Sequence, residues 1–312
     1  MKKNLILGAI RDLQFRDIKP FFDSLEQTGF DGDVCFWASD LSPEIQNELT
    51  SRGVRLFPFN EIRVKIPFRN RRINLFRRAF PLMHALLRFR LTFQTEEESK
   101  EYLRDFAKKY FSVHSQRFFH FEEFLSDNLE AYEKVLITDV RDVVFQSNPF
   151  DDVLGNTVYC FLEDSRFTLR SEKWNSTWLK EIGGQKLLDE LGDYPISCSG
   201  VTIGGATAVL NYLRVLNSNL LSNLHHKGLE QGTHNVIIRK GLIDCNVVEN
   251  NRGPVLTMGL MRPSDIHFDD GGSIVNESGK KIAILHQFDR HPEIERKIHS
   301  MISTSNRVQA VN

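Results

Sequence analysis

The stretch YEKVLITDVRDVVFQ, from Tyr132 to Gln146, decides both the fold and the place of the functional site. Its apolar run VLI is followed directly by Asp139, Arg141 and Asp142, and then by a second apolar run, VVF. A short apolar run between polar residues is typical of a buried strand. In an open α/β sheet, ligands bind at the carboxyl ends of the strands. We therefore expect the functional site to lie where this strand ends.

The two carboxylates after this strand are candidate metal ligands. Carboxylates three positions apart repel each other and lose hydration on burial unless a cation offsets their charge. Hard oxygen ligands suit Mg²⁺ or Mn²⁺, which would in turn hold phosphate oxygens. A second interpretation fits the local residues equally well: Asp139 and Asp142 cap a turn, and Arg141 pairs with one of them.

Length and composition indicate a globular protein. The chain has 312 residues, 41% of them hydrophobic, enough for one large α/β domain or one domain with an appendage. With 40 Lys and Arg against 41 Asp and Glu, its net charge of −1 creates no overall field that would attract nucleic acid. The cysteines have no C-x-x-C spacing, which favours buried thiols over zinc ligands or disulfides: Cys35, Cys160, Cys198 and Cys245.

Apolar runs in the chain are short. The run from Leu5 to Ile10 is too short for a signal peptide, and no run approaches the roughly 18 residues of a membrane-spanning helix. We therefore expect a cytoplasmic protein, or one that is peripheral on the inner face of a membrane.

The N-terminal part of the chain alternates between strands and helices. We predict strands at 4–10, 33–38 and 54–57 and helices at 17–28 and 41–52, a pattern typical of parallel βαβ units. The segment LGAIRD at 7–12 lacks G-x-G-x-x-G, so a Rossmann dinucleotide site has no support. Ala9 and Arg11 near the end of the first strand, and Asp40 after the second, are placed to contact a nucleotide base or ribose. Ordinary loop charges are an equally good interpretation of Arg11 and Asp40.

The stretch from 61 to 93 is an insertion of strongly basic composition. Glu61 is its only acid, and its many arginines are interleaved with Phe and Leu. Such a segment can lie on an anionic membrane surface, to which each cation contributes about 1 kcal/mol. The alternative is a helical subdomain packed on the body of the protein. Pro67 and Pro81 count against the membrane interpretation, because they would interrupt any long helix. A nucleic-acid patch has less support, since the chain contains no recognition motif.

Further candidate residues occur along predicted helices. Arg117, at the start of a predicted helix, can reach a diphosphate, and a structural salt bridge explains it equally well. Trp174 and Trp178, four positions apart, can stack on a sugar ring or anchor a lid, although core packing is the commoner use of such a pair. Glu230 and Gln231 precede an apolar helix face and are either part of a site floor or a capped helix start.

Polar residues also follow the later predicted strands. The strand at 157–162 ends in Glu163 and Asp164, and the strand at 282–285 ends in His286, a residue type with ligand chemistry. Gly200, within the strand segment after Pro195, permits close approach of a ligand to the backbone, or a bulge.

Four of these blocks, in this order, resemble the motifs of GT-A type glycosyltransferases, and the resemblance covers most of the chain except the basic insertion. The strand at 135–142 with FQ at 145–146 is similar to the family's strand and D-x-D-like motif. SCSGV at 197–201 resembles the strand ending in S-G-V that lines the donor sugar and acceptor. EQGTHN at 230–235 resembles the D-Q-x-x-x-N block, and ILH at 284–286 resembles the late strand whose His completes the metal site.

The resemblance implies an α/β fold with a single Rossmann-like mixed sheet flanked by helices. It implies one catalytic domain at 1–304, a basic helical insertion at 61–95 and a loose tail at 305–312. The implied activity is transfer of a sugar, hexose-like, from a nucleotide diphosphate-sugar, with UDP favoured. The acceptor would be a saccharide or lipid-linked saccharide in cell-surface polysaccharide assembly. Mn²⁺ or Mg²⁺ would neutralise the leaving diphosphate.

Carried over residue by residue, the family's metal ligands correspond to Asp139, Asp142 and His286. The motif here is D-x-R-D, so Arg141 stands where the family has its second aspartate. Either Asp142 binds through a water on the metal, or Arg141 itself offsets the diphosphate charge. His286 favours the first, because a metal-free site has less need of an imidazole.

The resemblance also assigns residues to the substrates. Ser199, Gly200, Glu230 and Gln231 would line the donor sugar, and the arginines Arg117 and Arg141 would contact the diphosphate. The base that deprotonates the acceptor is left open between Glu163 and Asp164, as is inversion or retention at the anomeric carbon.

Three other functions compete with this interpretation. A metal-dependent phosphohydrolase with Asp139 as nucleophile would need its second acid two positions later. A nucleotidyltransferase would need a Gly-rich N-terminal loop followed by Lys. The third alternative is a non-catalytic nucleotide-sugar-binding module.

Overall fold

The computed structural model describes residues 2–59, 64–65, 72–73, 86, 89, 91, 93–223 and 229–309, with the side chains of 64–65, 72–73 and 304–309 excepted. Most of the predicted basic insertion at 61–95 lies outside the described residues, as do residues 310–312 of the predicted tail.

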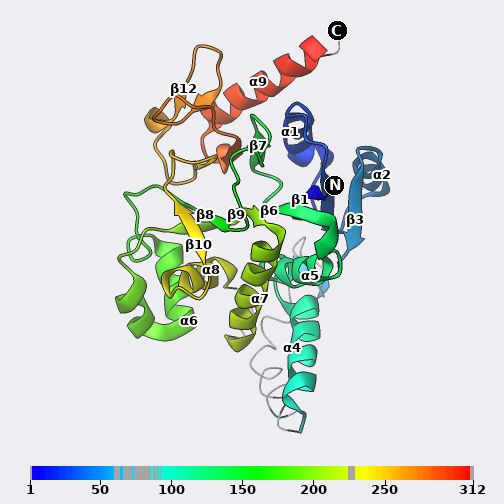
Figure 1. The fold of residues 1–312 in the computed structure, drawn as a ribbon, viewed down its shortest axis with the longest axis vertical. Helices are drawn as coiled ribbons and strands as arrows, with labels where there is room; N and C mark the ends of the chain where they lie inside the picture. The colour runs from blue at the N-terminus through cyan, green and yellow to red at the C-terminus, as the bar shows by residue number, and fades with distance from the viewer. Residues whose placement is uncertain are drawn as a thin grey trace.

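Among the described residues, seven strands form a central sheet (Figure 1). Their order across the sheet is β10-β8-β9-β6-β1-β2-β3. β9 runs antiparallel to β6 and β8, and the other neighbouring pairs are parallel. The predicted α/β fold with a mixed sheet is confirmed. The strands are β1 (Lys3–Arg11), β2 (Asp33–Ser39), β3 (Val54–Pro58), β6 (Tyr132–Thr138), β8 (Val158–Leu162), β9 (Ser197–Gly205) and β10 (Cys245–Val248).

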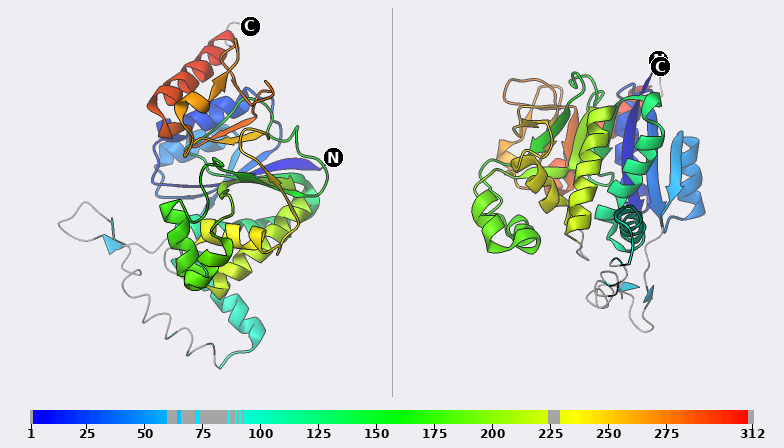
Figure 2. Two further views of the ribbon diagram at one scale, coloured as in Figure 1. Left: turned by 90° about the vertical axis from the view of Figure 1, so that its left-hand side faces the viewer. Right: turned by 60° about the horizontal axis from the view of Figure 1, so that its bottom comes forward.

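Helices cover both faces of this sheet (Figure 2). One face packs against α4 (Glu96–Tyr110), α5 (Val113–Asp127), α7 (Ala206–Ser222) and α8 (Glu230–Arg239), and α6 (Lys173–Leu191) packs on α8. The other face packs against α1 (Phe15–Glu26) and α2 (Pro43–Ser51). α4 extends away from the sheet beyond α5 (Figure 1).

Burial on both faces explains why the strands are apolar runs. In β6, Val135 and Ile137 belong to the core under α5 and α7, whereas Leu136 belongs to the core under α1. Successive side chains of a strand point to opposite faces, so a strand covered on both sides needs apolar residues at every position.

Local capping residues set several helix starts. The Thr95 hydroxyl accepts from the Glu98 N–H at 3.3 Å, and the Glu98 carboxylate accepts from the Thr95 N–H at 2.9 Å, which is a capping box at the start of α4. The Ser42 side chain accepts from the Ile45 N–H and so caps α2, whose first helical residue is Pro43. The predicted helix at 41–52 is thus α2, which begins at Pro43 directly after its cap.

A smaller sheet stands beside the end of β6. It has the order β11-β14-β7, from β11 (Val255–Thr257), β14 (Ile284–His286) and β7 (Val143–Phe145). The hairpin β12 (His267–Phe268) and β13 (Ile274–Val275) and the helix α9 (Pro292–Gln309) pack on it. Short 3-10 helices are η1 (Leu129–Ala131), η2 (Pro263–Asp265) and η3 (Phe288–Arg290), and β4 (Val64–Lys65) pairs with β5 (Arg72–Ile73). Because β7 follows β6 after a short turn, this sheet brings β14 to the carboxyl end of β6.

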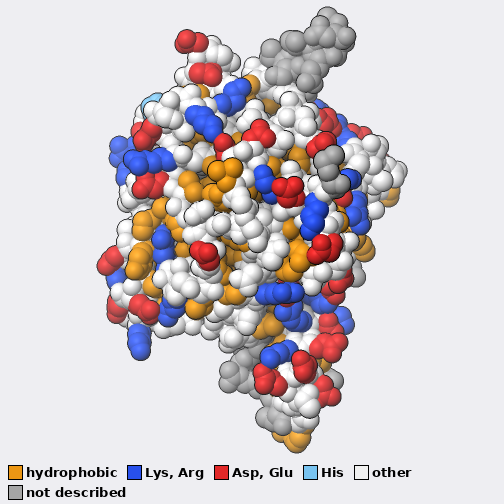
Figure 3. Space-filling view, viewed as in Figure 1, with side chains coloured by type: hydrophobic (Ala, Val, Ile, Leu, Met, Phe, Trp, Pro, Cys, Tyr) orange, Lys and Arg blue, Asp and Glu red, His pale blue; other side chains and the backbone are white. Residues whose placement is uncertain are grey.

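The C-terminal helix α9 packs through Ile294, Ile298 and Ile302. Its backbone continues to Gln309, within the stretch that the sequence predicts as a loose tail. In the described part of the chain, none of the helices combines the length and the apolar character needed to span a membrane. Figure 3 shows basic and acidic side chains interspersed over one face of the molecule, in keeping with the net charge of −1.

Candidate active site

The turn between β6 and β7 places Asp139 and Asp142 where the two sheets meet. The backbone N–H of Asp139 donates to the Gly200 carbonyl of β9 at 2.7 Å, which continues the contact of β6 with β9. β14 runs antiparallel to β7, with His286 opposite Val143, the residue after Asp142. Pairing between strands far apart in sequence therefore brings His286 to the two carboxylates.

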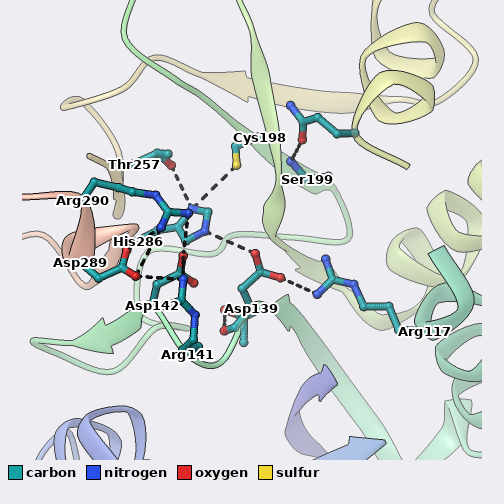
Figure 4. Close-up of polar contacts among 12 residues, drawn as sticks. Arg117, Asp139, Arg141, Asp142, Cys198, Ser199, Thr257, His286, Asp289 and Arg290 are labelled. Carbon is teal, nitrogen blue, oxygen red and sulfur yellow. Dashed lines mark hydrogen bonds and ion pairs between the residues drawn. The ribbon is translucent and has the colours of Figure 1, made fainter. Parts of the chain in front are cut away.

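Asp139, Asp142 and His286 form one cluster. Each offers a ligand atom, and these atoms all lie within 4.8 Å of one another. His286 and Asp142 are buried, whereas the Asp139 side chain is 33% exposed, so the cluster is accessible on the Asp139 side. Figure 4 shows Asp139 between the imidazole of His286 and the guanidinium of Arg117.

The donor atoms of this cluster fit a divalent cation. Within the described part of the chain, the buried Nε2 of His286 has no hydrogen-bond partner, and it faces Oδ2 of Asp139 at 3.6 Å. Its Nδ1 lies 3.4 Å from Thr257 Oγ1 and 3.8 Å from Cys198 Sγ on the other side of the ring (Figure 4). Two carboxylates and an imidazole nitrogen suit a divalent cation such as Mn²⁺ better than Mg²⁺, which prefers oxygen ligands, and contacts at Nδ1 orient the ring as they do in metal-binding histidines.

Gly200 leaves the space that such a cation needs. A β-carbon at this position would lie 2.5 Å from His286 Cε1 and 2.8 Å from Asp139 Oδ2. Any other residue would therefore fill the space between two of the candidate ligands.

Electrostatic coupling in the cluster also favours a cation. Burial opposes the charge of Asp139, but Arg117 and His286 hold the pKa of its carboxyl well below the usual range. Burial raises the pKa of Asp142, and Asp139 raises it further against the opposing effect of His286. Burial alone would lower the pKa of His286, but Cys198 and Asp139 raise it well above the ordinary value. The two carboxylates resist a double negative charge, which a bound cation would relieve.

Arg141 does not occupy the cluster. Its guanidinium Nη2 lies 2.9 Å from Asp289 Oδ2 and 3.9 Å from Asp142 Oδ2, and its side chain is 48% exposed. Arg290, from η3, lies 3.7 Å from Asp142 Oδ2 and 3.2 Å from Asp289 Oδ1. Asp289 therefore pairs with both arginines next to Asp142. The Asp142 carboxylate remains directed toward His286 in the cluster.

A cavity of about 350 Å³ opens beside the cluster. Six of the predicted site residues line it: Ala9, Arg11, Arg117, Asp139, Arg141 and Asp142. His114 and Arg290 also line it, although sequence reasoning did not single them out. Their positions offered a clue, because His114 lies close to Arg117 on one helix and Arg290 follows His286 closely after β14.

The other predicted donor-sugar residues, Ser199, Gly200, Glu230 and Gln231, lie where α8 meets β9 and are not among the residues that line this cavity. Gln231 uses both ends of its amide on strand backbone: Oε1 accepts from the Ser199 N–H at 2.8 Å, and Nε2 donates to the Ser197 carbonyl at 2.9 Å. The Glu230 carboxylate accepts from the Ser115 hydroxyl at 2.7 Å. These contacts tie α8 to α5 and to the strand that carries Gly200.

Two further residues of α8 hold the same strand, and sequence reasoning gave them no individual role. Asn235 accepts from the Ser197 N–H at 2.8 Å and donates to the Ser197 carbonyl at 2.9 Å. The buried His234 lies 2.9 Å from both the Ser197 hydroxyl and the Tyr212 hydroxyl. With Gln231, they fix the start of β9 and therefore the position of Gly200.

The two base candidates after β8 have different surroundings. Glu163 is buried near Cys198 and His286, and burial raises its pKa to about 7. Asp164 points elsewhere: its carboxylate accepts from Arg166 Nε at 2.9 Å, and it lines a second cavity of about 380 Å³ with Asp265. Asp40 is exposed after β2, in left-handed backbone with φ of 56°, and is not among the residues that line the first cavity.

No protein-family model matches the chain, and no curated protein sequence matches it significantly. Three of the similar solved structures are structures of glycosyltransferases. Core-mannan synthase A from Aspergillus fumigatus, in its Mn/GDP-form, is 12% identical with a TM-score of 0.40, covering 80% of this chain and 73% of that chain. Galactosyltransferase LgtC, in complex with donor and acceptor sugar analogs, is 14% identical with a TM-score of 0.47, covering 96% and 95%. An active-site mutant of LgtC is 14% identical with a TM-score of 0.46 at the same coverage.

Proposed function

We propose that the protein is a glycosyltransferase that moves a sugar from a nucleotide diphosphate-sugar, with UDP favoured, to a saccharide acceptor. The observation that supports this most is that a candidate cation site lies next to an arginine-lined cavity. The cluster of Asp139, Asp142 and His286 lies at the wall of a cavity that several arginines line. A site that combines divalent-cation ligands with guanidinium groups suits a diphosphate.

Cleavage of the bond between the sugar and the diphosphate leaves negative charge on the leaving group, so the site must supply positive charge there. When bound, Mn²⁺ or Mg²⁺ would supply Lewis-acid stabilisation of the leaving diphosphate. Arg141 and Arg290, both about half exposed, can turn from Asp289 toward a phosphate. Arg11, at the end of β1, is placed for the nucleoside part, with the Ala9 backbone beside it.

For the acceptor base we favour Glu163 over Asp164. A carboxylate whose pKa is about 7 is a stronger base than an ordinary carboxylate and is still partly ionised near neutral pH, so it can accept the proton of a hydroxyl group in the transition state. Asp164 is engaged by Arg166, which lowers the pKa of Asp164 although burial opposes the shift. Its carboxylate is therefore a weaker base.

We test the metal assignment with UDP binding and UDP-sugar hydrolysis, each measured with and without Mn²⁺. We expect Mn²⁺-dependent UDP binding that Asp139→Ala, Asp142→Ala and His286→Ala each weaken at least about tenfold, a loss of roughly 1.4 kcal/mol. Asp127→Ala, at an exposed carboxylate that ends α5, is the control. Unchanged turnover in both aspartate variants would overturn the metal assignment. A wild-type protein that neither binds nor hydrolyses any UDP-, GDP- or dTDP-sugar would overturn the glycosyltransferase itself.

The variant Arg141→Ala tests whether Asp142 or Arg141 completes the cation site in the D-x-R-D turn. If Asp142 serves the cation, this variant keeps its Mn²⁺ affinity and loses UDP affinity, because Arg141 pairs closely with Asp289 and lies 3.9 Å from Asp142. Equal loss of both affinities would assign Arg141 to the cation site.

We further propose that the acceptor is lipid-linked and that the basic segment at 61–93 brings the enzyme to an anionic membrane, as in cell-surface polysaccharide assembly. Three apolar side chains at its end support this, because they are 60%, 67% and 77% exposed: Leu86, Phe89 and Phe93. Leu86 and Phe89, three positions apart in helical backbone, suit one face of a helix lying on a membrane, and Phe93 follows in a turn.

Co-sedimentation with vesicles tests the membrane proposal. We expect pelleting with phosphatidylglycerol vesicles that falls with salt and is weak with phosphatidylcholine. Replacement of Leu86, Phe89 and Phe93 together by Ser should abolish it, and Leu154→Ser, at a residue that is 73% exposed, should not. No pelleting of the wild type would favour a soluble acceptor.

A further inference from the structure

Trp174 and Trp178 form an aromatic surface at the start of α6 that the proposed donor site does not use. Trp174 is 60% exposed, and the two indoles lie stacked with ring centroids 6.4 Å apart and planes inclined by 29°. The commoner use of two tryptophans at this spacing, packing into the core, therefore does not apply to Trp174.

Hydrogen bonds connect this surface to the candidate active site. The Gln231 amide accepts from the Ser199 N–H at 2.8 Å and contacts Asn175 Oδ1 at 3.4 Å. Asn175 follows Trp174 in the chain, and Ser199 precedes Gly200 at the cation cluster. The α8 backbone also passes close to Trp178, because a β-carbon at Gly232 would lie 3.0 Å from Trp178 Cβ.

Sheet order places the two tryptophans away from the cavity proposed for the nucleotide. The cavity proposed for the nucleotide is lined from β1, α5 and the turn after β6. α6 packs on α8, which holds β9, and β9 lies on the opposite side of β6 from β1. A molecule on Trp174 would therefore lie on the other side of β6 from the nucleotide cavity, which is the side left open for an acceptor.

The first turn of α6 holds Trp174 rigidly. The Glu172 carboxylate accepts from the backbone N–H groups of Trp174 at 3.0 Å and Asn175 at 2.8 Å. It also accepts from the Asn175 side chain at 2.8 Å. Because its backbone is fixed and an indole has only two side-chain torsions, Trp174 loses little conformational entropy when a ligand binds it.

The surroundings of Trp174 suit a saccharide. Neighbouring positions in the first turns of α6 are polar, among them Glu172, Lys173, Ser176 and Thr177. The ammonium of Lys173 lies 5.6 Å from the Trp174 ring centroid, so one ring face has a cation and donor close by. A sugar ring offers a C–H face to an indole and hydroxyls to polar groups around it. A protein partner would instead need a larger apolar core to its interface.

We infer that Trp174, supported by Trp178, is a stacking platform for the saccharide acceptor. This inference rests on the proposed function, because it assigns the acceptor to the side of the site that the donor leaves open.

The test uses the full-length protein with UDP and Mn²⁺ present. The probes are an immobilised panel of defined oligosaccharides that includes lactose, cellobiose, chitobiose and mannobiose, and UDP itself. The variants are Trp174→Ala, Trp174→Phe and, as matched control, Tyr194→Ala at an aromatic side chain that is 45% exposed and packs over Arg239.

We expect the wild type to bind at least one saccharide of the panel. Trp174→Ala should weaken this binding at least about tenfold, Trp174→Phe should weaken it by about threefold or less, and Tyr194→Ala should leave it unchanged. UDP affinity should be the same in all four proteins. Because Trp174 is exposed, these variants should also unfold at the wild-type temperature.

Two outcomes would overturn the inference: saccharide binding that Trp174→Ala leaves intact, or no saccharide binding by a wild type that still binds UDP with Mn²⁺. Failure of the proposed function gives a different result, since the wild type would then bind no nucleotide at all. Saccharide binding that depends on Trp174 in such a protein would still support the platform.

Discussion

Arg117 holds Asp139 from the side opposite His286. The guanidinium Nη1 lies 2.5 Å from Oδ1 of the carboxylate, while Oδ2 faces Nε2 of His286 at 3.6 Å. The Arg117 side chain is only 6% exposed, so its charge depends on this partner. One carboxylate oxygen is thus occupied by the protein, and the other is directed toward the candidate cation position.

Replacement of Arg117 by Met should destabilise the metal-free protein by about 3 kcal/mol, because Asp139 loses its closest cation. The loss is at the low end for a buried pair since Asp139 is partly exposed. Added Mn²⁺ should restore more stability to Arg117→Met than to the wild type, because the cluster has lost a positive charge. Thermal unfolding with and without Mn²⁺ measures both effects.

Arg104→Met is the control for Arg117, since Arg104 pairs with the buried Glu122 at 2.8 Å away from the cluster. It should lose stability without any additional response to Mn²⁺. An equal response to Mn²⁺ in both variants would contradict the role assigned to Arg117.

Gly200→Ala should abolish Mn²⁺ binding in a protein that still folds. The added methyl group would lie 2.5 Å from His286 Cε1 and 2.8 Å from Asp139 Oδ2, so it would separate the candidate ligands. Isothermal titration with Mn²⁺ on folded protein measures the loss, which we expect to exceed about hundredfold.

The control for Gly200 is Gly204→Ala in the same strand. Its β-carbon would lie 2.3 Å from the Thr157 carbonyl, so it should cost stability. Its folded fraction should still bind Mn²⁺ like the wild type. If Gly200→Ala bound Mn²⁺ normally, the cation would have to lie elsewhere.

Cys198 should tune metal affinity through His286. Its sulfur lies 3.8 Å from Nδ1, and this contact helps to direct Nε2 toward the carboxylates. Removing groups that orient a metal-binding histidine commonly costs about 10–100-fold in affinity, so Cys198→Ala should weaken Mn²⁺ binding at least about tenfold. Cys160→Ala removes a thiol of the same sheet that is equally buried and should leave the affinity unchanged. Equal effects of the two variants would indicate general loosening of the core.

Glu163 should make stability depend on pH. Its pKa is about 7 in the folded protein, against an ordinary value of 4.5. Between these values the folded state holds a proton that the unfolded chain has released, so the free energy of unfolding falls as pH rises, by roughly 3 kcal/mol in total. The Glu163→Gln side chain stays neutral, so the stability of this variant relative to the wild type should increase between pH 4 and pH 8.

Asp164→Asn should behave in the opposite sense, because the pKa of Asp164 is lowered in the folded protein. The stability that its ionised form contributes is present above the unfolded pKa and is lost as pH falls through the folded pKa. The variant should thus be less stable than the wild type near neutral pH, with the difference vanishing in acid. Urea unfolding in EDTA at a series of pH values measures both. A Glu163→Gln profile parallel to that of the wild type would contradict the raised pKa.

Much of the fold could be predicted from local patterns. The predicted strand at 33–38 is β2 (Asp33–Ser39), and the predicted helix at 41–52 contains α2 (Pro43–Ser51). Apolar runs and capping residues are local, and they act within a few positions of the element that they determine. The antiparallel direction of β9 was less accessible, since it depends on which strands become neighbours.

The sequence by itself determined the elements and the chemistry at their ends: a buried strand at Val135 to Ile137, followed by carboxylates, and a later strand followed by an imidazole. Only the tertiary structure decided which of these groups meet. Strand pairing across the small sheet brings His286 to Asp142, and the contact of Arg117 with Asp139 joins two other elements. The tertiary structure also directs the Gln231 amide to the backbone of β9, gives Glu163 and Asp164 different surroundings, and leaves Trp174 exposed. Such contacts join residues far apart in the chain, and their geometry depends on packing of the whole core, which no local pattern encodes.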